Sequence, residues 1–205
     1  MCGRACDNQV MLAEWSVECS TEDPVLVVPW KDPDGNAAFV DLRANPYDFE
    51  AIPEAERYPP LMQALRALNA TRSPVFTAKC DAWSLDAEEL EHLHIDLDIL
   101  PADAPAGFAS YIDLVARERS LFTSFPQHEQ LLLRLARLAA PLNYPSAMLD
   151  CVIRPALVDL EGPQQGFAFS LYVKALGIDQ QAASQEWALA LEGVIALVRG
   201  KDFSR

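Results

Sequence analysis

Apolar residues recur at every second position in several segments of this chain, and this alternation restricts its fold more than any other feature. Successive side chains of an extended strand point to opposite faces, so a period of two predicts a strand with one buried face. The pattern is clearest over residues 11–19, 75–83 and 167–176. Further strands are expected over residues 25–30, 37–42, 109–115 and 148–158, although the segment from 109 could equally start a helix through Arg119.

Turn and helix signals divide these strands. Asp32-Pro33-Asp34-Gly35 predicts a hairpin turn, because proline presets φ and glycine tolerates positive φ. Asp86 followed by Glu89 forms a capping-box pattern for a brief helix. Apolar residues at helical spacing predict a short helix that starts near Pro59 and two further helices that start near Phe125 and Asp179.

The order of these elements predicts an α+β fold, with mainly antiparallel sheet and helices packed on one face. The second half, β-α-β-β-α, fits a ferredoxin-like split β-α-β arrangement whose missing last strand would come from the first half. We expect a single globular unit over residues 1–205. The Pro- and Ala-rich segment 101–107 could divide it into an acidic, β-rich subdomain, 1–100, and a second subdomain, 107–205.

The net charge of −14 lies almost entirely in the first half of the chain. Residues 1–105 hold 7 basic and 20 acidic side chains, whereas residues 106–205 hold 9 and 10. Nucleic-acid binders need clustered Lys and Arg, so nucleic acid and anionic lipid are not expected as ligands. The acidic half would instead dock a basic partner protein, bind a cation or imitate nucleic acid, unless it is simply a solvated, solubilising surface.

Membrane and secretory signals are not found in the sequence. No apolar stretch approaches the about 18 residues of a membrane helix, and the first residues lack the apolar segment of a secretory signal. Five cysteines, an odd number, do not resemble a disulfide framework. We therefore expect a cytoplasmic protein that does not contact a membrane.

The candidate metal site is the alternating segment 92–99. If this segment is a strand, His92 and His94 point to one side, and Asp96 on the same face could complete a Zn, Mn or Fe site. His92, His94 and Asp96 are thus the candidate ligands of a divalent transition metal, the only cofactor that the sequence suggests. The alternative is the wet face of an amphipathic strand, which gives the same pattern without function.

Other reactive side chains have simpler structural explanations. Cys19, Cys80 and Cys151 fall on the apolar side of their expected strands and are interpreted as core residues. Cys2 and Cys6 could bind a soft metal or lie in a frayed terminus. Asp113 with Arg117 could serve a pocket or form a helix-surface ion pair. His128 is expected to be solvated. Tyr172 with Lys174 could form a ligand platform or a dimer surface.

Phosphate-loop, dinucleotide, nucleophile-elbow and HExxH motifs are absent from the sequence. The leading hypothesis is therefore a non-catalytic binding or accessory protein that docks a partner protein through its acidic N-terminal half. The alternatives are a small metal-dependent enzyme that uses the His-x-His site, and an acidic inhibitor that imitates nucleic acid. A homodimer is also considered.

Overall fold

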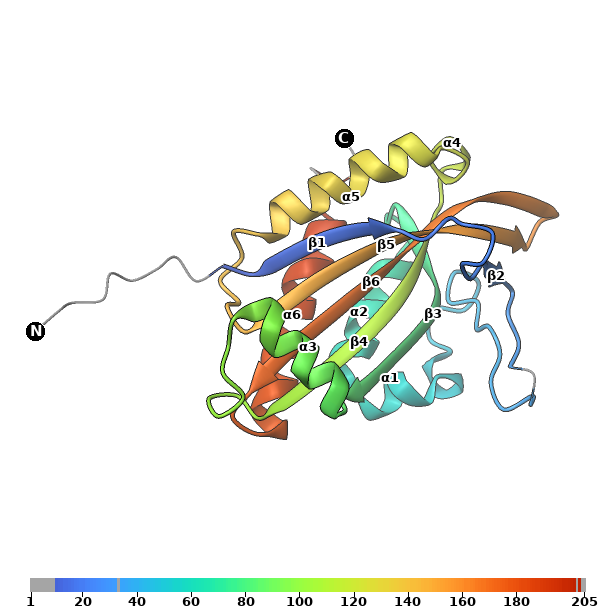
Figure 1. The fold of residues 1–205 in the computed structure, drawn as a ribbon. Coiled ribbons are helices and arrows are strands. Elements are labelled where there is room, and N and C mark those ends of the chain that lie inside the picture. The colour runs from blue at the N-terminus through green and yellow to red at the C-terminus, as the bar shows by residue number, and fades with distance from the viewer. Residues whose placement is uncertain (1–9, 33, 202, 204–205) are drawn as a thin grey trace, which may run out of the picture.

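The structure is a computed structural model that describes residues 10–32, 34–201 and 203. Its centre is one sheet with the strand order β1-β5-β6-β4-β3, in which β2 pairs with β5 (Figure 1). Strands β3, β4, β6 and β5 pair antiparallel in that order, whereas β1 and β2 run parallel to β5. The strands are β1 (Leu12–Val17), β2 (Leu26–Val28), β3 (Val75–Ser84), β4 (Ala106–Ala116), β5 (Ala147–Asp159) and β6 (Pro163–Gly177).

Helices cover the sheet unequally. The main core lies between one face of the sheet and helices α2, α5 and α6, while α3 packs on one end of the other face (Figure 1). The predicted α+β class with a mainly antiparallel sheet is confirmed. The helices are η1 (Phe49–Ala51), α1 (Pro53–Arg57), α2 (Pro59–Asn69), α3 (Ala87–Leu97), α4 (Arg119–Phe122), α5 (Phe125–Ala139) and α6 (Gln180–Val198).

Helix α6 anchors the covered face of the sheet. Its N-cap, Asp179, accepts a hydrogen bond from the backbone N–H of Ala182, which satisfies one of the free donors of the first turn. Trp187 is fully buried, and its indole N–H donates to the Ser110 hydroxyl across 2.8 Å. Its ring lies 4.7 Å from that of Phe108, between centroids. The opposite face of β4 is thereby left for other contacts.

The predicted strand over residues 92–99 is wrong, because these residues belong to helix α3 and the loop that follows it. The capping box at Asp86 is present, but the helix that it starts continues to Leu97. Leu90, Leu93 and Leu97 also recur at helical spacing, and these three pack toward the sheet. Ile95, which the alternation placed inside, is 69% exposed.

Two other strand predictions need correction. The strand expected over 37–42 is reduced to a single antiparallel bridge between Lys31 and Ala38, although Gly35 has a positive φ of 75° and its N–H donates to the Asp32 carbonyl. In β3 the pairing register shifts between Thr77 and Lys79, which is a β-bulge. The side chains of β3 that precede the bulge therefore point to the opposite sheet face from the one that strict alternation predicts.

Both halves of the chain contribute to the same sheet. The segment 101–107 leads from α3 into β4, and β4 pairs with β3 from the first half and β6 from the second. Strand β6 lies between β4 and β5, as a split β-α-β unit requires, and β3 lies beside β4. The ferredoxin-like description and the two subdomains stay predictions. Among the described helices, none is long and apolar enough to cross a membrane.

Candidate binding groove

The sheet face opposite α6 carries two rows of polar side chains. Residues that are directly opposite each other on paired strands lie on the same face of a sheet. The register of β3, β4 and β6 thus brings together one row made of Asp81, Tyr111 and Tyr172. The next row, one step along the strands, is made of Lys79, Asp113 and Ser170.

A second segment, residues 24–32 and 34–40, closes over this face. It starts beside β5, where β2 pairs, and reaches the opposite edge of the sheet, where the Trp30 indole N–H donates to the Ala78 carbonyl across 2.8 Å. The bulge in β3 lies at this point of contact. The segment therefore crosses the sheet from edge to edge and forms a wall above the polar rows.

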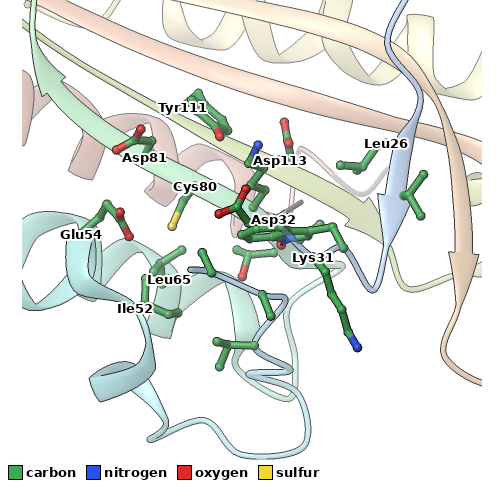
Figure 2. A pocket seen from close by; sticks show the side chains of 18 of the residues that line it. Leu26, Lys31, Asp32, Ile52, Glu54, Leu65, Cys80, Asp81, Tyr111 and Asp113 are labelled. Carbon is green, nitrogen blue, oxygen red and sulfur yellow. Dashed lines mark hydrogen bonds between the residues drawn. The ribbon is translucent and has the colours of Figure 1, made fainter. Parts of the chain in front are cut away.

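Between this wall, the sheet and the start of α1 lies a groove of about 840 Å³. Figure 2 shows Asp81, Tyr111 and Asp113 on the sheet side, Ile52, Glu54 and Leu65 on the helix side, and Cys80 between them. All but four of the described residues that line it belong to the range 24–81. The four others are Tyr111, Asp113, Arg154 and Tyr172.

A hydrogen-bonded chain holds the floor of the groove in place. Arg154 of β5 makes an ion pair with Glu18 at 2.8 Å and donates to the Ser170 hydroxyl at 3.1 Å. Ser170 in turn donates to the Asp113 carboxylate at 2.5 Å. The chain links three adjacent strands and orients the Asp113 carboxylate.

Asp113 is an acid in a poorly solvated place, since only 6% of it is exposed. Burial raises the pKa of its carboxyl, while the Ser170 hydrogen bond and the charges of Arg154 and Lys79 lower it. The upward effect is the largest, so the pKa is raised overall. Within the described part of the chain, Ser170 is the one hydrogen-bond donor to this carboxylate.

Cys80 lines the groove, but its thiol is a poor nucleophile. Burial raises its pKa to about 12, and the carboxylates of Glu54, Asp81 and Asp113 add to this effect. A thiol with such a pKa stays protonated at neutral pH, and only the thiolate attacks an electrophile. No histidine is among the described residues that line the groove. Of the other thiols, Cys151 is buried in the core, as expected, whereas Cys19 is exposed.

The three predicted metal ligands are on α3 and do not form a common face. His92 and Asp96 are exposed, whereas His94 is buried and its Nε2 donates to the Ala104 carbonyl across 2.8 Å. Residues two apart on a helix point to nearly opposite sides, so the His-x-His spacing separates the imidazoles. In residues 10–32, 34–201 and 203, no group of three or more His, Cys, Asp or Glu is arranged to hold a metal ion.

The third histidine, His128, is not solvated as the sequence predicted. It is fully buried at the start of α5, with its ring 6.1 Å from that of Phe169, between centroids. Its Nδ1 donates to the Ser124 carbonyl across 3.1 Å, and its Nε2 has no hydrogen-bond partner among the described residues. Burial lowers its pKa.

The remaining candidates are distributed between the groove and other places. Tyr172 lines the groove. Asp113 lies in strand β4 and Arg117 directly follows it, so the two residues form no helix-surface pair. Arg117 instead donates from Nε to the Val75 carbonyl. Cys2 and Cys6 lie outside the described residues.

Comparisons with protein-family models, curated proteins and solved structures find no match to this chain.

Proposed function

We propose that this protein is a non-catalytic binding protein that docks a partner protein through its acidic N-terminal half, and that the partner places a basic segment in the groove. The observation that supports this most directly is the electrostatic environment of Cys80. Three carboxylates, those of Glu54, Asp81 and Asp113, each raise the pKa of this thiol, so a negative potential extends over the middle of the groove. Such a potential attracts a cationic side chain.

The charges that line the groove leave the carboxylates in excess. Among the described residues, four acids and three bases line it. Of the bases, Arg154 is already paired with Glu18, and the Lys31 side chain points away from the other labelled side chains in Figure 2. Lys79 is therefore the principal cation inside the groove.

The rest of the wall suits a peptide segment better than a small metabolite. Val25 and Val27 line it with exposed fractions of 53% and 45%, and the groove volume is near the upper end of the roughly 300–1,000 Å³ of small-molecule sites. Exposed apolar side chains next to carboxylates favour a segment with both apolar and basic residues. The protonated thiol of Cys80 supports binding rather than nucleophilic catalysis.

The alternatives are weaker. The His-x-His enzyme depended on a strand, and α3 separates His92 from His94. An acidic inhibitor that imitates nucleic acid would use exposed carboxylates, such as Glu88 and Glu91 on α3, rather than the groove. The proposal places the protein in the cytoplasm, where thiols stay reduced, and a homodimer is compatible with it.

Selection from a library of ten-residue peptides tests the proposal, with binding of the selected peptides then measured by fluorescence anisotropy. We expect peptides with Lys or Arg beside apolar residues to be selected. The double variant Glu54→Gln/Asp81→Asn should weaken their binding at least tenfold, whereas Glu88→Gln/Glu91→Gln, with the same loss of charge on α3, should leave it within twofold. Neutral or acidic peptides, or equal losses in the two variants, would contradict the proposal.

The inhibitor alternative predicts the opposite pattern. A nuclease or DNA-binding protein would be captured in a salt-sensitive way, and the α3 double variant would lose it while the groove variant kept it. Size-exclusion chromatography with light scattering reports separately on the homodimer.

A further inference from the structure

The ammonium group of Lys79 lies between two aromatic rings that come from distant parts of the chain. Its Nζ is 5.3 Å from the ring centroid of Trp30 and 6.0 Å from that of Tyr111. Both distances are within the range of cation–π attraction. The Trp30 ring is fixed by its hydrogen bond to the Ala78 carbonyl, so its position does not depend on Lys79.

A carboxylate lies on the same face of the sheet. Asp113 is the direct cross-strand partner of Lys79, and the Lys79 charge lowers its pKa. Asp113 is more than nine-tenths buried and lines the groove, yet within the described ranges its carboxylate receives one hydrogen bond, from Ser170. Because burial raises the pKa of this carboxyl, a cation or a donor that approaches it from the groove stabilises its charged form.

Lys79 occupies this place loosely. Its side chain is exposed, and no carboxylate among the described residues lies within the 4.0 Å of an ion pair from its Nζ. At an exposed position, cation–π contacts alone stabilise the bound position of a flexible lysine by about 0.5–1 kcal/mol. It can therefore leave at little cost.

We propose that Trp30, Tyr111 and Asp113 form a binding site for an ammonium group, which Lys79 fills in the free protein and which takes a lysine side chain of the partner when Lys79 withdraws. This inference rests on the proposed function and gives it a ligand class. The group that the rings already hold is an ammonium, and this favours a partner lysine over arginine. Lys79 then acts as an internal competitor that keeps a cation near the carboxylate, without an ion pair, until the partner arrives.

The occupied site can be tested in the free protein by NMR of the lysine side chains. Ring currents from Trp30 and Tyr111 should move the Hε resonances of Lys79 upfield of those of Lys31, whose side chain points away from the other labelled side chains (Figure 2). Trp30→Leu should abolish most of this difference. Equal shifts for the two lysines in the wild-type protein would overturn the occupied site.

The competition is tested with a defined probe, the blocked tripeptide acetyl-Ala-Lys-Ala-amide, with norleucine in place of lysine as its control. Lys79→Met should bind the lysine probe about two- to fivefold more tightly than wild type, which is what about 0.5–1 kcal/mol of competition corresponds to. Lys31→Met removes the same charge from the groove lining and should change affinity less. In Lys79→Met, Asp113→Asn should remove the preference for lysine over norleucine.

Several results would overturn the inference. Equal gains in the two lysine variants would mean that net charge alone acts, and weaker binding in Lys79→Met would mean that Lys79 contacts the ligand. No binding of the probe to Lys79→Met would mean that the site does not exist. If the peptide library still selects basic segments in any of these cases, the docking function stands and only the ammonium site fails; if it does not, both fail.

Discussion

Replacing Asp113 by Asn should stabilise the fold while it weakens the ammonium site. The raised pKa of Asp113 means that burial opposes its charge more than Ser170, Arg154 and Lys79 support it. Asn has the same shape, and its Oδ1 can still accept the Ser170 hydroxyl, so the chain that holds the groove floor is preserved. Removing such a cost at a functional position typically adds about 0.5–2 kcal/mol to the free energy of unfolding.

The gain should depend on pH in a defined direction. The folded-state pKa of Asp113 lies above its unfolded value of 3.8, so at neutral pH the charged form lowers wild-type stability. As the pH falls through the folded-state pKa toward 3.8, the wild-type carboxyl takes up its proton and this cost disappears. The advantage of Asp113→Asn is therefore full at pH 7 and lost near pH 3.5.

Urea unfolding of both proteins at pH 7 and at pH 3.5 measures this difference, with thermal melting as a second readout. For a chain of this size 1 kcal/mol corresponds to about 2–4 °C in Tm. Asp159→Asn, an exposed acid at the end of β5, is the matched control and should change stability by no more than about 0.5 kcal/mol. A destabilised Asp113→Asn protein at pH 7, or a difference independent of pH, would refute the reasoning.

Three further predictions concern the scaffold, each checked by urea unfolding. Gly177→Ala should cost about 1–3 kcal/mol, because a Cβ there would lie 2.2 Å from the Ala183 nitrogen; wild-type stability would contradict the close packing of β6 on α6. Burial lowers the pKa of His128 below its unfolded value of 6.5, so the free energy of unfolding of the wild type should fall as the pH drops below that value. His128→Phe should flatten this fall between pH 7.5 and 5. Parallel pH profiles for the two proteins would exclude a buried neutral imidazole. Trp187→Phe should cost about 1–3 kcal/mol, because the buried Ser110 hydroxyl loses its donor, and no cost would mean that the bond does not form.

Much of the fold follows from local patterns in the sequence. Helix α6 was predictable because its buried residues recur at the helical period, and strands β1 and β6 were predictable because their apolar residues alternate. Segment 92–99 shows where this reasoning fails. Its apolar residues satisfy a period of two, but Leu90, Leu93 and Leu97 also satisfy the helical period. The capping box at Asp86 is the sequence signal that favours the helix over the strand.

The groove was less accessible to sequence reasoning than the fold. Asp113 was noted as a candidate and Tyr172 as a platform residue, but their meeting depends on the registers of β4 and β6. Lys79 reaches Trp30 only because the segment of residues 24–32 and 34–40 crosses the sheet, a long-range contact without a local signal. The sequence predicts a solvated His128 because it lies beside Glu129 in the first turn of a helix, yet the side of α5 that carries it packs on the sheet.

Photo-crosslinking in the native host tests the central claim, that the groove receives a basic segment of a partner protein. A benzoylphenylalanine replaces Val27, which lines the groove, or as a control Leu189, an exposed apolar residue of α6 outside it. We predict a discrete product for position 27, with the crosslinked partner peptide containing lysine, and no such product for position 189. A product at position 189 alone, or a position 27 product whose partner peptide is acidic, would contradict the account.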